Sequence, residues 1–287
     1  MRIQRVPSKW AKTEVILLNR SLAPYIPDTR KYDSAVLSEM LVLYETVYIK
    51  PDRGTYGSGV MRAERRNLTL SPSGAENPEE HEEENTEPIT LYILRYGTKA
   101  QAYRSIEELH QAISERIQER PYLIQKGIDL LRYKKLPFDL RVLVQKNPEG
   151  RWETTGLLGR VAAPKKIVTN YHNGGRILPV EALFVEHMNT SERSAMIYRL
   201  KHLGVHIGRQ LETAFPGMKE IGLDVAMDDR HELWILEVNT LPSLVAFKLF
   251  DDKSIYRKIR RYAAAYGRAG FGNASLSSRR NQLTRGR

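Results

Sequence analysis

Residues 221–239 read IGLDVAMDDRHELWILEVN, two apolar runs separated by four polar residues. Both runs are rich in strand-forming residues, and the polar residues between them predict a hairpin turn. A four-residue loop pairs Met227 with Glu232 and places Asp224 opposite Ile235. This hairpin is the strongest structural signal in the chain, and the other motifs are placed around it.

Three oxygen-bearing side chains share one face of this hairpin. Because side chains on a strand alternate with a period of two, Asp224, Glu237 and Asn239 point the same way. Leu236 and Val238 then point into the opposite layer. Two carboxylates and an amide are costly to bury without a cation, and such oxygen ligands suit Mg²⁺. The alternative is a hairpin with one solvated polar face, but Glu-Val-Asn ahead of Thr-Leu-Pro-Ser favours the metal.

A lysine at the end of a predicted strand precedes a glycine-rich segment, Gly-Thr-Tyr-Gly-Ser-Gly. Backbone N–H groups in such a loop can approach a polyphosphate while the ammonium group meets its oxygens. The segment is not a Walker A loop, because the lysine precedes the glycines. A flexible hairpin turn is the alternative. The candidate phosphate-binding residues are Lys50, Gly54, Gly57, Ser58 and Gly59.

Arginines supply a third group of candidates. Asp139 and Arg141 fall on one face of a predicted strand, with apolar residues on the other. Arg160 follows the next strand, and the polar stretch 168–175 contains Asn170. Arginine suits bidentate contact with phosphate or carboxylate oxygens, whereas structural ion pairing is the alternative for each arginine taken singly.

The remaining sequence alternates between helix and strand patterns, which predicts an α+β fold. Helices are predicted through residue 44 from a cap at Asp28 or Thr29, at 106–120, at 188–214 with an interruption at Gly204 and Gly208, and at 254–266. Strands are predicted at 46–50, 89–95, 122–125, 139–146, 152–158, 166–169, 221–227 and 232–239.

Composition excludes several classes of protein. The 287 residues contain no cysteine, so thiol catalysis, disulfides and thiolate zinc sites are ruled out. No apolar run is long enough to span a membrane, and the N-terminal apolar run is too short for a signal peptide. We therefore expect a soluble cytoplasmic protein.

The net charge of +11 is concentrated at the C-terminus. Residues 253–287 hold ten of the 45 lysines and arginines and no acid, which leaves 35 basic against 34 acidic residues before them. This near-neutral body disfavours a nucleic-acid-binding protein, although such a tail can bind anionic polymers. The opposite bias occurs at 71–87, where seven glutamates and no basic residue predict a mobile loop.

The order of these motifs resembles the ATP-grasp fold. Over roughly residues 10–250 the chain is similar to the YheC/YheD family of endospore-associated ATP-grasp proteins, with the likeness carried by residues 122–128, 138–147 and 156–161. The resemblance implies that ATP lies between two α+β lobes. Lys50 would hold the α and β phosphates beneath the loop 54–59. Gln125, Lys126 and Ile128 would form the hinge that meets adenine.

The same resemblance implies roles for the other candidates. Asp224, Glu237 and Asn239 would hold Mg²⁺. Arg141, Arg160 and Asn170 would face the transferred phosphoryl group, whose charge they would neutralise. The implied organisation is an N-terminal segment 1–27, a lobe 28–120 that includes the acidic loop 71–87, a lobe 121–250 with the metal site, and a basic helix and tail 251–287.

The resemblance implies an ATP- and Mg²⁺-dependent carboxylate–amine ligase that works through an acyl phosphate. Its expected substrate is a peptide or cell-wall-type precursor in a spore-forming bacterium. A full pre-ATP-grasp domain is not expected, because fewer than about 30 residues precede Asp28. Either a second subunit or a partner protein would then complete the acceptor site, or that site would be absent. The alternative from another class is a spore-associated structural or regulatory protein that binds ATP without ligating anything.

Overall fold

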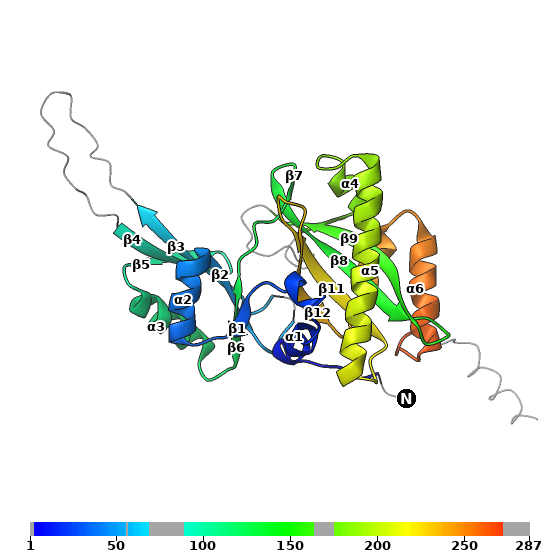
Figure 1. The fold of residues 1–287 in the computed structure, drawn as a ribbon, viewed down its shortest axis with the longest axis horizontal. Coiled ribbons are helices and arrows are strands. Elements are labelled where there is room, and N and C mark those ends of the chain that lie inside the picture. The colour runs from blue at the N-terminus through cyan, green and yellow to red at the C-terminus, as the bar shows by residue number, and fades with distance from the viewer. Residues whose placement is uncertain (1–2, 56, 69–88, 164–174, 272–287) are drawn as a thin grey trace, which may run out of the picture. The chain divides into compact units, whose positions relative to one another are not determined.

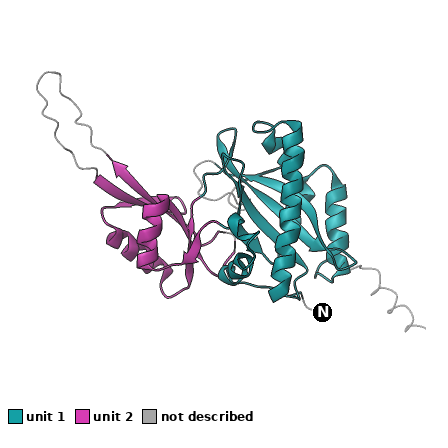
Figure 2. Cartoon of the chain, viewed as in Figure 1, with its two compact units in different colours: residues 1–26, 128–164, 169–287 teal, residues 27–127, 165–168 magenta. Residues whose placement is uncertain are grey.

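The computed structural model describes residues 3–55, 57–68, 89–163 and 175–271. Within these residues the chain forms two compact units, a smaller one of residues 27–127 and a larger one of the residues on either side (Figure 2). The expected acidic loop at 71–87, the expected strand at 166–169, Asn170 and the tail beyond residue 271 lie outside the described residues.

The smaller unit contains one antiparallel sheet with strand order β1-β6-β2-β3-β4-β5 (Figure 1). Its elements are β1 (Thr29–Lys31), α2 (Ser34–Tyr44), β2 (Thr46–Pro51), β3 (Met61–Leu68), β4 (Ile89–Tyr96), β5 (Lys99–Tyr103), α3 (Ile106–Ile117) and β6 (Tyr122–Lys126). The two helices pack together over one face of the sheet and share one hydrophobic core with it. The opposite face therefore carries the polar side chains of β2 and β6.

The larger unit contains a second antiparallel sheet, in which β10, β9, β8, β11 and β12 lie side by side and β7 pairs with β8. Its elements are α1 (Lys9–Leu17), the 3-10 turn η1 (Ala23–Tyr25), β7 (Arg132–Tyr133), β8 (Leu136–Lys146), β9 (Trp152–Val161), β10 (Arg176–Leu178), α4 (Val180–Phe184), α5 (Thr190–Ala214), β11 (Glu220–Met227), β12 (Leu233–Asn239), the 3-10 turn η3 (Val245–Leu249) and α6 (Lys253–Ala265).

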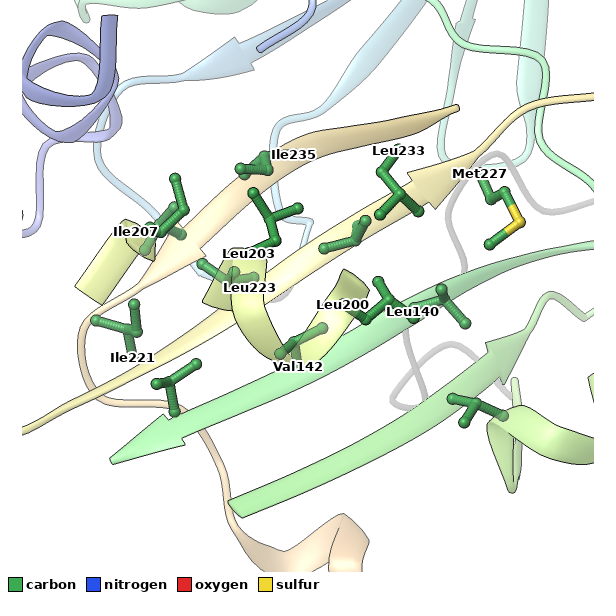
Figure 3. Close-up of a cluster of buried hydrophobic side chains, with 14 of the residues drawn as sticks. Leu140, Val142, Leu200, Leu203, Ile207, Ile221, Leu223, Met227, Leu233 and Ile235 are labelled. Carbon is green, nitrogen blue, oxygen red and sulfur yellow. The ribbon is translucent and has the colours of Figure 1, made fainter. Parts of the chain in front are cut away.

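Helix α5 covers one face of this sheet. Leu200, Leu203 and Ile207 pack from the helix onto alternate residues of β8, β11 and β12, as Figure 3 shows for Val142 and Leu223. Alternation along each strand buries these residues and leaves their neighbours for the other face. At about 25 cal/mol per Å², burying this apolar surface is the main stabilising term of the unit.

The other face of the same sheet is divided between a second apolar cluster and a charged cluster. Helix α6 and η3 pack there through Phe247, Ile259 and Ala263 against Leu143 and Leu158. Toward the start of β8 the same face carries buried charged residues instead. This division sets where the candidate site lies.

Two expected helices differ from the structure in their details. Asp33, rather than Asp28 or Thr29, caps α2 by accepting a hydrogen bond from the Val36 backbone, and Thr29 belongs to β1. The expected interruption of α5 is absent, and the helix is continuous from Thr190 to Ala214. Gly204 does not break the helix but marks where it lies close to Val142 and Val144. A Cβ at that position would lie 2.8 Å from the Val144 side chain.

The connection between the expected lobes also differs. Strand β6 pairs with β1 and β2, so residues 122–126 pack in the smaller unit, and the unit boundary falls between Gly127 and Ile128 rather than after residue 120. The N-terminal segment is part of the larger unit, where α1 packs on α5. Among the described residues, no helix has the length and hydropathy needed to cross a membrane.

Candidate active site

The hairpin of β11 and β12 brings Asp224 and Glu237 directly opposite each other. The expected register is wrong by one residue at the turn, since Met227 pairs with Leu233 rather than Glu232. The Asp228 side chain accepts hydrogen bonds from the Arg230 and Glu232 backbone N–H groups, which keeps Glu232 in the loop.

Continued without a break, this register would place Leu236 opposite Asp224. A register shift between Asp224 and Val225, which is a β-bulge, instead returns Glu237 to the face of Asp224. Bulges insert one extra residue, which here is Leu236, half-buried on β12. Beyond the bulge, Asp224 lies opposite Glu237, and Asn239 lies opposite Gly222. The conclusion that the three oxygen-bearing side chains share a face is therefore confirmed by the register, through pairings that the sequence alone did not predict.

Asp224 is held by two arginines from neighbouring strands. Arg141 on β8 lies opposite Asp224, and its Nε donates to Oδ1 at 2.6 Å. Arg160 on β9 places its guanidinium 3.2 Å from the same oxygen. Burial alone would raise the pKa of Asp224, but the charges of the two arginines outweigh it and lower the pKa below its usual value. Asp224 is therefore an anion in the folded protein.

Arg160 is itself fixed by a second aspartate. Asp139 lies opposite Arg160 across β8 and β9 and accepts two hydrogen bonds from its guanidinium, at 2.7 and 2.5 Å. Burial opposes the charged form of Arg160, but Asp139 and Asp224 raise its pKa, so it stays a cation. Two aspartates and two arginines thus alternate across three adjacent strands, and the sum of their charges is zero.

Glu237 and Asn239 extend this cluster onto the edge strand. Both side chains are half-buried, and Lys9 from α1 places its ammonium 3.6 Å from a Glu237 oxygen. Among the described residues no group of three or more His, Cys, Asp or Glu side chains forms a metal-binding cluster. The donor set here is instead two carboxylates and one amide oxygen, which fits a Mg²⁺ ion that keeps waters and phosphate oxygens as its other ligands.

In the smaller unit, Lys50 and Gln125 lie together on the sheet face away from the helices. Tyr48 pairs with Gln125, so Lys50 is its diagonal neighbour. The Lys50 ammonium donates to Gln125 Oε1 at 2.5 Å, and Gln125 Nε2 donates to the Thr29 hydroxyl at 2.8 Å. Lys50 is only 9% exposed, so its charge is held in a defined position.

The expected hinge residues separate in the structure. Gln125 and Lys126 belong to the smaller unit, and Lys126 lies over the Tyr44 ring at 5.2 Å. Ile128 belongs to the larger unit, at the point where the chain returns to it. Gly127 between them has no room for a side chain, because a Cβ would lie 2.9 Å from the Thr46 carbonyl oxygen.

The glycine-rich segment is described except for Tyr56. Gly54, Gly57 and Gly59 all have positive φ, at 154°, 73° and 75°. L side chains rarely adopt these angles, so the three glycines set the path of the loop. Ser58 donates its backbone N–H to the Thr55 carbonyl at 3.2 Å.

Several neighbours of the candidates were not expected from the sequence. Thr29 completes the Lys50–Gln125 chain, Lys9 contacts Glu237, and Asp139 holds Arg160. The first two come from segments remote in sequence and carry no motif. A strand alignment of 136–146 with 152–161 would have placed Asp139 opposite Arg160, but this requires the bulge between Leu143 and Val144.

Each unit is a helix-covered antiparallel sheet, and the larger unit carries a buried charged cluster. Comparison with solved structures finds a similar fold. The crystal structure of D-cycloserine synthetase DcsG superposes with a TM-score of 0.50 at 10% identity, covering 91% of this chain and 70% of that one. At this identity the likeness shows the fold alone.

The family is defined by sequence. A family model described as YheC/D-like ATP-grasp matches residues 3–269, and the chain belongs to that family. Two curated relatives come from Bacillus subtilis (strain 168). The endospore coat-associated protein YheD is 25% identical over 84% of this chain, and the endospore coat-associated protein YheC is 20% identical over 83%. The matches span 49% and 60% of those relatives' own lengths.

Proposed function

We propose that this protein is a Mg²⁺- and ATP-dependent carboxylate–amine ligase. The observation that carries the proposal is the charged cluster of the larger unit, where Asp224 is buried, ionised and placed opposite Glu237 beside two arginines. Membership of an ATP-grasp family supports the same chemistry. Lys50 and the loop 54–59 of the smaller unit are the proposed partners of the ATP phosphates.

Each group has a defined chemical task in this proposal. Asp224, Glu237 and Asn239 would hold Mg²⁺, which neutralises charge on the phosphates when bound. Arg141 meets the phosphoryl group as it moves from ATP to the substrate carboxylate, and the acyl phosphate is then attacked by an amine. Arg160 is held by Asp139 and in turn contacts Asp224, so its task is to fix the position of Asp224. Asn170 is the remaining proposed phosphoryl contact, from outside the described residues.

The proposed substrates are a carboxylate and an amine, with a peptide as the favoured carrier of one of them. A second subunit or a partner protein would complete the acceptor site. Because the curated relatives are named for the endospore coat, we place the protein in a spore-forming cell, in the cytoplasm or at the spore.

A panel experiment tests the reaction class. ATP turnover is measured with a series of amino acids and short peptides, alone and in pairs, with ADP and AMP separated. An acyl-phosphate ligase produces ADP, and hydroxylamine in place of the amine traps the acyl group as a hydroxamate. Turnover that yields AMP, or ADP release that is unaffected by every carboxylate, would contradict the ligase.

The second candidate is an ATP-binding structural or regulatory protein of the spore. The names of the two relatives favour it, since both refer to the coat rather than to a reaction. In this case MgATP raises the unfolding temperature by mass action, but no pair of substrates increases ADP release. Thermal unfolding and ADP release measured on the same samples therefore separate the two candidates.

A further inference from the structure

One edge of the larger sheet is covered along only part of its length. Strand β9 has ten residues, and in the part of the chain that the structure describes its outer edge pairs only with β10, through residues 159–161. Pro179 follows β10 directly and the chain turns into α4, so residues 152–158 continue without a neighbouring strand on that side. An exposed edge of this kind presents backbone donors and acceptors to a further strand.

A groove runs along this open edge. Helices α5 and α6 lie on opposite faces of the sheet with β9 between them (Figure 1). The groove has a volume of about 680 Å³, with residues 154–157 as its floor, α5 as one wall and α6 with the preceding loop as the other. Apolar side chains occur on both walls, among them Ile197, Leu249 and Ile255. Leu249 is 54% exposed, which is high for a leucine in this unit.

The charges of the groove differ between its two ends. The Thr154 hydroxyl donates a hydrogen bond to the Lys201 backbone carbonyl, and Lys258 contacts Glu153. Both lysines therefore lie at the end of the groove nearer residue 153. Glu181 comes three residues after Leu178, which pairs with Gly159, and therefore lies at the opposite end.

Two further carboxylates join Glu181. The chain passes from Phe247, which meets Gly156, to Lys258 beside Glu153, so Asp251 and Asp252 lie on the Glu181 side of Lys258. One end of the groove is thus acidic and the other carries lysines.

We propose that this groove binds an extended peptide segment of a partner protein, which adds a strand to β9 in line with β10. The open edge requires an extended backbone, and the two walls require apolar side chains at alternate positions, because alternate residues point to opposite faces. A strand that continues the direction of β10 starts at the acidic end and finishes at the lysines. The peptide therefore carries a basic residue near its N-terminus. This site is independent of ATP and of the proposed ligase reaction.

Selection from a displayed library of random nonapeptides tests the proposal on the full-length protein. We expect enrichment of sequences that alternate apolar residues after an N-terminal lysine or arginine. Leu249→Glu should weaken binding of a selected peptide about tenfold, because it places a charge on the apolar wall. Leu18→Glu is the matched control at an exposed leucine of α1's C-terminal cap, 80% exposed and outside the groove, and it should change nothing.

Backbone methylation distinguishes strand addition from other modes of binding. Two versions of the selected peptide are made, one N-methylated at the odd residues and one at the even residues. A peptide that pairs with β9 along one edge uses the N–H groups of alternate residues only. Methylation of those residues should abolish binding, and methylation of the residues between them should be tolerated. The double variant Glu181→Lys with Asp251→Lys should shift selection from basic to acidic N-terminal residues.

Four results would overturn the proposal: no enriched sequence, equal binding of both methylated peptides, unaltered binding by Leu249→Glu, or an equal loss in Leu18→Glu. Sedimentation of the protein alone is the remaining measurement. A dimer that Leu249→Glu dissociates and Leu18→Glu does not would show that a second copy of the chain, rather than a partner peptide, occupies the groove.

Discussion

At the scale of single residues, Asp224 is part of the structure as well as of the proposed metal site. Its carboxylate neutralises Arg141 and Arg160 at a buried position, whereas Glu237 is more exposed and contacts only the ammonium of Lys9 among the ion pairs of the described residues. The two carboxylates should therefore respond differently to neutralisation.

Glu237→Gln is the cleaner test of the metal site. The side chain keeps its size and loses one charge, so Mg²⁺-dependent ATP turnover should fall at least about a hundredfold. The unfolding temperature should change little, because a partly exposed ion pair at 3.6 Å contributes about 1 kcal/mol or less. Steady-state turnover and thermal unfolding are measured on the same samples, and wild-type turnover in the variant would remove Glu237 from the ligand set.

Asp224→Asn should lower both turnover and stability. Removing one partner of a buried ion pair costs on the order of 3 kcal/mol, since the arginine charges are left without compensation. The pKa of Asp224 is lowered on folding, so its stabilising effect is present above the usual aspartate pKa and is lost as the pH falls through the lowered value.

Urea unfolding of wild type and Asp224→Asn between pH 7 and pH 3 measures this effect. The difference in free energy of unfolding should be largest at neutral pH and should shrink toward the acid end. A difference that grows as the pH falls would contradict the ionised state of Asp224.

Lys50 supplies the corresponding test in the smaller unit. Lys50→Ala should weaken ATP binding by about ten- to a hundredfold, because a charge-assisted contact is worth roughly 1.5–3 kcal/mol. Adenosine has no phosphates and should bind wild type and variant alike. Calorimetric titration with both ligands makes the comparison, and an equal loss for adenosine would mean that Lys50 only supports Gln125.

At the scale of elements, helix α6 is fastened by residues beyond its end. Arg268 donates to the buried Glu220 carboxylate at 2.7 Å and to the Pro242 carbonyl at 2.8 Å, and Tyr266 donates to the same carboxylate at 2.6 Å. The sequence pattern ended the predicted helix at residue 266, and these contacts extend the packed part of the chain to Arg268.

Two truncations test this boundary. A chain ending at Phe271 should unfold at the wild-type temperature, whereas one ending at Tyr266 should lose on the order of 3 kcal/mol, because Glu220 is left buried without its arginine. Thermal and urea unfolding give both values. Equal stability of the two truncations would show that Arg268 does not fasten the helix.

At the scale of the whole molecule, only part of the excess positive charge lies beyond the described residues. Residues 272–287 contain four arginines and no acidic residue. The chain ending at Phe271 should therefore leave a phosphocellulose column at lower salt than wild type, since fewer counterions are released on binding. Its ATP turnover with a small substrate should be unchanged. Unchanged elution would locate the anion-binding charge in the body, for example on the arginines of α6.

The sequence by itself determined the class of fold and most of the candidate residues. Alternation in 221–239 was enough to place Glu237 and Asn239 on one face of their strand, because side-chain direction along a strand is a local property. That Asp224 shares this face depends on the turn register and on the bulge. The order of the motifs, which needs no coordinates, indicated the family. The amphipathic spacing of α6 was equally local.

Only the tertiary structure decided which of these residues meet. The pairing of Asp139 with Arg160 and of Arg141 with Asp224 depends on strand register across 21 and 83 residues. Bulges on β9 and β12 shift the β8–β9 and β11–β12 registers by single residues. A bulge is stabilised by the packing on both sides of a sheet, so a local pattern does not predict it. For the same reason the open edge of β9, which depends on where β10 ends, was visible only in the folded protein.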